Sequence, residues 1–289
     1  MVAAKKEQNS VFITVDFECL THDLCRAIGT TSSPKLRTQA LLESIENLEE
    51  LLIQTNQTNK RVTFFCTGVT ADLYPDIIKL IASKGHEIAC HGNFHDDLFK
   101  MSAKDVYTSL SLARDKLSQL IQNEVRGFRA PRFSIDKYDY ERLRQISKVF
   151  DYDSSLHFKD ENEYNRWKQK CPVELVEFPV PKQRFSFLNF EVKTGGSYLK
   201  LFPGRIVKNT IIKSAKNGLT PIVYLHPYDL YYGYDMLAHW SELKGATNKK
   251  YWYIRQIQWA GLFNSRQKKK LFQLFDAFQN IGTLGDQSF

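Results

Sequence analysis

The stretch RVTFFCTGVTADLYPDIIKLIASKGHEIACHGNFH, residues 61–95, decides the fold class of this chain. Its first part, 61–68, is a short apolar run closed by a glycine, which is typical of a buried β-strand. Residues 72–84 carry apolar side chains at helical spacing, and Gly85 follows as a C-cap. The next apolar run, 86–90, predicts a second strand. A strand, a helix and a strand in this order predict two parallel strands joined by a crossover helix.

The same alternation continues on both sides of this stretch. Short apolar runs alternate with longer amphipathic segments. The expected strands are 11–15, 125–131, 150–155, 173–180 and 221–227, and the expected helices are 36–54, 102–122, 139–148 and 204–218. This order predicts an α/β fold with a (β/α) barrel plan, in one domain of residues 1–289. Within it, residues 231–289 are expected to pack on the barrel as an aromatic and basic extension.

His91 and His95 follow an expected strand and are four residues apart. This spacing lets two imidazoles share one face of a helical turn and bind one metal ion, although such pairs also arise by chance. Asp16 and Glu18 follow the first expected strand, and their carboxylates point the same way in an extended chain. One carboxylate and two histidines make a catalytic metal site with open positions, and the other carboxylate can act as a base. Carboxylates at a strand end also serve as turn or capping residues.

Two further polar residues, Arg129 and His226, follow other expected strands. The arginine can hold a carboxylate ionised, and the histidine can donate a proton to a leaving amine near neutral pH. Alone, the arginine is more typical of a salt bridge and the histidine of a structural hydrogen bond. In a (β/α) barrel the carboxyl ends of the strands meet at one rim, where active sites form. Polar residues after four strands therefore predict an active site at this rim.

The composition is that of a globular protein with a basic balance. Of the 289 residues, 43% are hydrophobic and 25% are charged, and the formal net charge of +8 favours anionic partners. No stretch approaches the ~20 apolar residues that a membrane span needs. The first ten residues lack the apolar core of a secretory signal, so we expect a cytoplasmic protein. The five cysteines follow no metal-binding spacing, and we expect reduced thiols.

The densest basic cluster, residues 266–270, begins an amphipathic segment. We expect a solvated helix face here, and a weak peripheral membrane contact is the less favoured alternative. No recognisable nucleic-acid-binding module is present, so nucleic acid is not an expected partner. The sequence does not specify the oligomeric state.

Five segments, in their order along the chain, resemble the motifs of the polysaccharide deacetylase family (NodB-homology, carbohydrate esterase family 4-like). They are VDFE, TFFCTG, HEIACHGNFH, FRAPRFS and YLHP. A further segment, GGSYLKLFP at 195–203, resembles the branch associated with surface-polysaccharide biosynthesis. The resemblance implies a distorted, incomplete (β/α) barrel and a divalent metal, usually Zn²⁺. Carboxylate and imidazole ligands also admit Co²⁺, Ni²⁺ or Mn²⁺.

By this resemblance the metal ligands are Glu18, His91 and His95, and the catalytic base is Asp16. The commonest family pattern has two adjacent aspartates, whereas Phe17 intervenes here and the second acid is a glutamate. The division of roles between Asp16 and Glu18 therefore stays open.

The resemblance also implies that Arg129 orients the base, that His226 is the general acid, and that the backbone N–H of Arg132 helps to bind an oxyanion. The Arg132 side chain, which stands in place of the usual aromatic or small residue, can contact an anionic substrate. Asp153 and Glu177 are both candidates for the acid that orients His226.

Phe133, Tyr228, Asp153 and Glu177 are candidate substrate contacts, and the aromatic segment 226–240 either stacks on sugar rings or packs as a lid. The resemblance implies a metal-dependent hydrolase that removes an N-acyl group, typically N-acetyl, from an amino sugar. The expected substrate is a nucleotide- or lipid-linked precursor, or a glycan, of lipopolysaccharide or capsule biosynthesis. The alternatives are a deformylase or cyclic-amide hydrolase on the same scaffold and a catalytically silent carbohydrate-binding protein.

Overall fold

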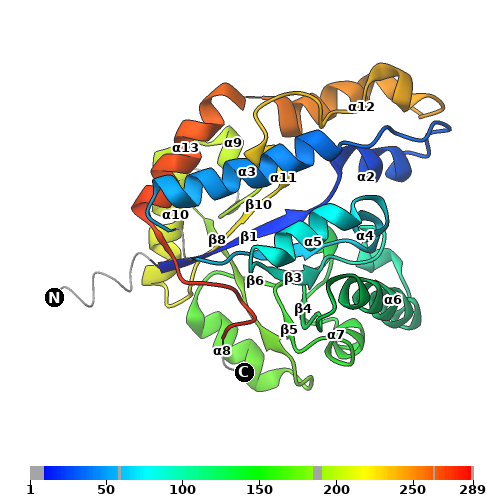
Figure 1. Cartoon of the computed structure of the whole chain (residues 1–289). Coiled ribbons are helices and arrows are strands. Elements are labelled where there is room, and N and C mark those ends of the chain that lie inside the picture. Colours follow the sequence, from blue (N-terminus) through cyan, green and yellow to red (C-terminus); the bar gives the residue numbers. More distant parts are fainter. Residues whose placement is uncertain (1–9, 58–59, 185–190, 263, 288–289) are drawn as a thin grey trace.

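The central feature of the fold is a parallel sheet that curves without closing (Figure 1). A computed structural model describes residues 10–57, 60–184, 191–262 and 264–287. The strand order is β10–β1–β2–β3–β4–β5–β7, with β11 also pairing with β1. These strands are Ser10–Phe17 (β1), Thr63–Cys66 (β2), Glu87–Cys90 (β3), Gly127–Phe128 (β4), Tyr152–Asp153 (β5), Val176–Glu177 (β7), Ile222–Leu225 (β10) and Gln279–Asn280 (β11). Because the outer strands β7 and β10 are not neighbours in this order, the barrel is incomplete, which confirms the predicted fold class.

Helices cover the outside of the sheet, and a small second sheet lies beside it. The helices are Leu20–Ala27 (α2), Thr38–Gln54 (α3), Gly68–Leu73 (α4), Pro75–Ser83 (α5), Ala103–Ile121 (α6), Tyr140–Ser147 (α7), Glu161–Lys170 (α8), Ser197–Leu201 (α9), Gly204–Lys216 (α10), Pro227–Leu230 (α11), Lys249–Gln256 (α12) and Asn264–Ala277 (α13). The second sheet has the order β6–β8–β9, with strands His157–Phe158, Val180–Arg184 and Glu191–Lys193. Short helical turns also span Leu98–Lys100, Pro131–Phe133, Trp240–Leu243 and Ile257–Gly261.

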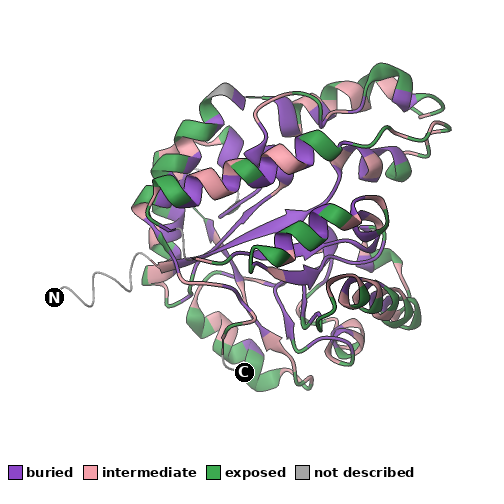
Figure 2. Ribbon diagram, viewed as in Figure 1, coloured by how far each residue is buried: buried purple, intermediate pink, exposed green. Residues whose placement is uncertain are grey.

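The burial of each element follows from its apolar pattern. All residues of β1 after Ser10 are buried, as expected for a parallel strand that is covered on both faces. Helix α3 buries the stripe formed by Leu41, Ile45 and Leu48 at helical spacing and turns its acidic side to solvent. Figure 2 shows the same division, with buried strands inside and exposed outer helix faces. Among the helices described here, none is long and apolar enough to cross a membrane.

Two expected elements are divided by prolines. The helix expected over 72–84 is split into α4 and α5 at Tyr74, because Pro75 lacks an N–H and begins a new helix at its first position. The strand expected over 173–180 becomes β7 and β8, which belong to different sheets, and Pro179 lies between them.

The basic cluster at 266–270 lies in α13, where a helix is expected. Arg266, Lys268 and Lys269 are exposed, as a solvated face requires. Lys270 differs, because its Nζ donates to the backbone carbonyls of Leu199, Lys200 and Phe202 at 2.6, 3.0 and 2.9 Å. This lysine therefore ties α13 to the end of α9.

Candidate metal and catalytic site

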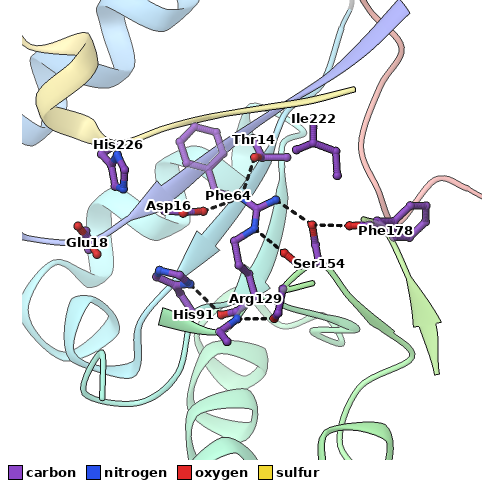
Figure 3. Close-up of polar contacts among 12 residues, drawn as sticks. Thr14, Asp16, Glu18, Phe64, His91, Arg129, Ser154, Phe178, Ile222 and His226 are labelled. Carbon is purple, nitrogen blue, oxygen red and sulfur yellow. Dashed lines mark hydrogen bonds and ion pairs between the residues drawn. The ribbon is translucent and has the colours of Figure 1, made fainter. Parts of the chain in front are cut away.

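The carboxyl ends of four strands of the same sheet bring the predicted polar residues to one place (Figure 3). Asp16 is the second-last residue of β1, and Glu18 follows that strand directly. His91, Arg129 and His226 are the first residues after β3, β4 and β10. The strand order places β1 between β10 and β2, so both acids stand between His226 and His91 along the rim. The prediction that these residues gather at one rim is thus consistent with the observed arrangement.

Glu18, His91 and His95 form a group suited to a metal ion. One ligand atom from each lies within 4.8 Å of the others, and all three residues are buried. His95 Nε2 lies 2.6 Å from Glu18 Oε2. His91 Nδ1 donates to the Arg129 carbonyl oxygen at 2.8 Å, which leaves its Nε2 for a ligand. A carboxylate and two imidazoles at this separation fit a divalent cation of the zinc type.

The two histidines do not share a helical turn, as the spacing had suggested. Residues 91–97 are irregular, and Gly92 and His95 both have positive φ, at 79° and 57°. The loop folds back at Gly92 and at His95, and the two imidazole centroids lie 5.2 Å apart. The left-handed backbone at a non-glycine residue marks His95 as strained, which is common at functional sites.

Burial and mutual charge set the protonation of this group. Burial favours the neutral form of Glu18, but His95, with His226 and His91, outweighs it and holds the pKa of this carboxyl well below its usual range. Burial lowers the pKa of His91 to about 4. His91 is therefore neutral near pH 7, and this is the form that binds a metal.

Arg129 is fully buried and holds Asp16. Its NH1 donates to Asp16 Oδ1 at 2.7 Å and to Thr14 Oγ1 at 2.8 Å. Its Nε and NH2 donate to the carbonyl oxygen and the Oγ of Ser154 at 3.1 and 2.9 Å. The guanidinium carbon lies 4.1 Å from the centre of the Phe65 ring. Every edge of the guanidinium is thus engaged, and the Asp16 carboxylate has a defined orientation.

His226 is held by Asp229, an acid that sequence reasoning missed. Asp229 Oδ2 lies 3.1 Å from His226 Nδ1 and accepts the His226 backbone N–H at 2.9 Å. Burial works against a charged imidazole, but the Asp229 hydrogen bond, with Glu18 and Asp16, raises the pKa of His226 to about 9. The sequence HPYD contained a signal for this contact, because an acid three residues after the first residue of a helix start often binds back to that residue.

The expectation that Asp153 or Glu177 orients His226 is wrong, as is their assignment as substrate contacts. They face each other in register across β5 and β7, and neither lines the cavity that contains Asp16, Glu18 and His226. Asp153 Oδ1 accepts the Ser154 N–H at 2.9 Å, and Glu177 Oε1 accepts the Leu156 N–H at 2.9 Å. Burial raises the pKa of both carboxyls. Their role is to fix the backbone beneath Arg129.

A cavity of about 520 Å³ opens beside the polar group. Its lining includes Phe133 and Tyr228, as expected, and also Arg132. The rings of His226 and Tyr228 are stacked, with their centroids 4.6 Å apart. Arg132 and Phe133 both have positive φ, at 54° and 56°, so this turn is strained where it borders the cavity.

Sequence reasoning also missed other residues that line this cavity, among them Asp23, Lys193, Trp252 and Trp259. The tryptophans come from α12 and the π-helical turn after it, which pack on α2 through Leu24 and Ile28. They lie beyond the aromatic segment 226–240, from which Tyr228 reaches the cavity. Asp23 is buried, burial raises its pKa to about 7, and its Oδ2 has no hydrogen-bond partner in the described part of the chain.

Comparisons with known proteins cover parts of the chain. Residues 45–150 match the family described as polysaccharide deacetylase, and residues 155–261 match a domain of unknown function, DUF3473. The chain is 31% identical to the peptidoglycan deacetylase-like protein FGM2 of Gibberella zeae over 41% of this chain and 34% of that protein. It is 33% identical to a peptidoglycan-N-acetylglucosamine deacetylase of Bacillus cereus over 31% of this chain and 30% of that protein. The match therefore spans about a third of the length of these relatives.

Among solved structures, the peptidoglycan deacetylase PdaC of Bacillus subtilis superimposes with a TM-score of 0.47. Its sequence is 10% identical, and the superposition covers 96% of this chain and 89% of that one.

Proposed function

We propose that this chain, which carries a polysaccharide deacetylase domain at residues 45–150, is a metal-dependent hydrolase that removes an N-acyl group from an amino sugar. The observation that supports this most directly is the set of groups that line one cavity. A ligand triad of Glu18, His91 and His95 borders the same cavity as a carboxylate, Asp16, and a protonated imidazole, His226. A binding module has no use for a base and an acid beside a metal.

A divalent cation held by the triad would polarise the amide carbonyl and lower the pKa of a water molecule. Zn²⁺ is the preferred ion, with Co²⁺, Ni²⁺ and Mn²⁺ as alternatives. Asp16, which Arg129 orients, takes the proton from the attacking water. The backbone N–H of Arg132 contributes to binding the carbonyl oxygen as its negative charge develops.

His226 completes the reaction by protonating the departing nitrogen. Because Asp229, with Glu18 and Asp16, raises the pKa of His226 to about 9, the imidazole carries this proton at neutral pH. The C–N bond breaks, and the products are a free amine on the sugar and a carboxylate, acetate in the simplest case. The proton that Asp16 accepted then returns to solvent, and His226 takes up a proton from solvent, which restores both groups to their starting forms.

The proposed substrate is an N-acetylated sugar precursor or glycan of surface-polysaccharide biosynthesis, carried on a nucleotide or a lipid phosphate. The net charge of +8 favours such an anionic molecule. The cavity of about 520 Å³ falls in the range of small-ligand sites, which suits a sugar unit. A cytoplasmic location stays a prediction, as does the single-domain organisation.

Elemental analysis together with an acid-release assay tests this proposal. Wild-type protein should hold about one metal per chain and release acetate from N-acetylated sugars or nucleotide sugars, and His91→Ala/His95→Ala should lose both. His239→Ala is a matched control, because this histidine is exposed and lies outside the cavity lining. Metal without acid release would favour a deformylase, a cyclic-amide hydrolase or a silent carbohydrate binder. Absence of metal after reloading would overturn the proposal.

A further inference from the structure

Two lysines stand directly opposite each other in the small second sheet. Lys182 on β8 and Lys193 on β9 are paired in register in an antiparallel ladder, so both side chains emerge on the same face. Like charges in such positions destabilise a sheet. Lys182 is compensated by Glu191, whose Oε2 lies 3.2 Å from its Nζ. Among the described residues, no carboxylate forms an ion pair with Lys193.

Lys193 is directed to the catalytic cavity instead. It lines that cavity, and its Nζ lies 5.0 Å from the centre of the Phe133 ring, which also borders the cavity. Burial and the nearby Lys182 lower the pKa of Lys193, and Glu191 opposes this shift only in part. A neutral residue at this position would suit the sheet better, so packing alone does not account for a lysine here.

The remaining charges of the cavity leave Lys193 without a counterion. Asp16 is neutralised by Arg129, and Glu18 faces the two histidines of the triad. Asp23 is the third carboxylate of the lining, and the charged side chain that acts on it most strongly is His95 of the triad. The side chain of Arg132 is exposed at the cavity and adjoins Phe133 in sequence.

We propose that Lys193, together with the Arg132 side chain, forms a subsite for an anionic group on the substrate. The group is a phosphate or a carboxylate attached to the N-acylated sugar, and both offer the oxygen acceptors that an ammonium and a guanidinium bind. This inference rests on the proposed function for the identity of the ligand as a sugar. It makes Lys193 a residue that selects substrates and takes no part in the bond-breaking steps.

Binding measurements test the subsite without requiring turnover. Metal-loaded protein is titrated calorimetrically with N-acetylglucosamine, N-acetylglucosamine 1-phosphate and N-acetylglucosaminuronic acid at constant ionic strength. The wild type should bind at least one charged sugar about tenfold more tightly than the neutral one, as expected for one charge-assisted hydrogen bond. Lys193→Met should lose this preference, whereas Lys193→Arg should keep it. Lys182→Met is the matched control, because it removes the opposing lysine from the same ladder but lies outside the cavity lining.

The charged sugars distinguish the two sources of the anion. A preference for the 1-phosphate assigns a phosphate-linked substrate, and a preference for the uronic acid assigns an acidic sugar. Equal or undetectable binding of charged and neutral sugars overturns the subsite, as does a preference that Lys193→Met retains. Acetate release from neutral sugars without a charge preference would keep the proposed function and overturn the subsite. A preference for charged sugars without acid release would keep the subsite and overturn the proposed function.

Discussion

Asp229 binds His226 twice, through the backbone and through the imidazole. One carboxylate oxygen, Oδ2, accepts the His226 N–H at 2.9 Å and lies 3.1 Å from Nδ1. Asp229 is fully buried at the start of α11 and forms an ion pair with this histidine. The contact fixes the ring so that Nε2 is the free nitrogen, and it stabilises the protonated form.

Asp229→Asn should therefore move the alkaline limb of the pH–rate profile to lower pH. The carboxylate raises the pKa of His226 to about 9, and a neutral amide removes that contribution. Activity that needs protonated His226 is present below this pKa and is lost as pH rises through it. A bound divalent cation lowers the wild-type value further, so the limb should lie below pH 9. The measurement is kcat/KM against pH, with the exposed Asp235→Asn as a control. An unchanged limb would exclude His226 as the titrating acid.

The roles of Asp16 and Glu18 can be separated by substituting each with its amide. Glu18→Gln should lower metal affinity about 10–100-fold or more, because it removes an anionic ligand from the triad. Asp16→Asn should retain the metal and lose turnover, because the amide cannot accept a proton. Metal content and acetate release are measured on both variants. If Asp16→Asn lost the metal and Glu18→Gln kept it, the two roles would have to be exchanged.

Arg129→Met should destabilise the protein by about 3–5 kcal/mol, because it leaves a buried carboxylate at Asp16 without its partner. Urea unfolding monitored by circular dichroism gives this difference. The double variant Arg129→Met/Asp16→Asn should recover part of the loss, since it removes the uncompensated charge. A double variant no more stable than the single one would show that the lost contacts to Thr14 and Ser154 dominate.

Gly195→Ala should be much more damaging than Gly204→Ala. A Cβ at position 195 would lie 2.1 Å from the Tyr224 carbonyl oxygen, which is fixed in β10. At position 204, the first residue of α10, the nearest atom is 3.5 Å away and belongs to a lysine side chain. Thermal unfolding should show a lower Tm for the first variant and little change for the second. Similar Tm values would mean that the segment between β9 and α9 moves without cost.

Periodicity was enough to predict the main strands and their rim, because apolar runs such as 11–15 and 86–90 are buried on both faces and leave a clear signal. It could not predict the loop that carries His95, since spacing alone cannot separate a helical turn from a chain that reverses at positive φ. It also missed Asp229. By sequence, Asp153 and Glu177 were equally good candidates for the acid that orients His226. Only the fold shows that they lie opposite each other on β5 and β7.

The least predictable part of the site comes from distant chain segments. Lys193 and Trp252 reach the cavity from β9 and α12, which follow the regular alternation of strands and helices. Nothing local in either segment indicates which side chain faces the cavity. A lysine side chain is usually exposed to solvent. That Lys193 stands opposite another lysine, Lys182, becomes visible only from the strand register.

The position of β1 has a consequence for synthesis of the chain. This strand pairs with β2 on one side, but its other neighbours, β10 and β11, are at residues 222–225 and 279–280. On the ribosome, the apolar edge of residues 11–15 therefore stays without its partners until most of the polypeptide has emerged. An unpaired, apolar strand edge is prone to associate with other chains. Ribosome-bound or truncated forms that end before residue 222 should consequently depend on chaperones, and the strand that carries Asp16 should be among the last to reach its final position.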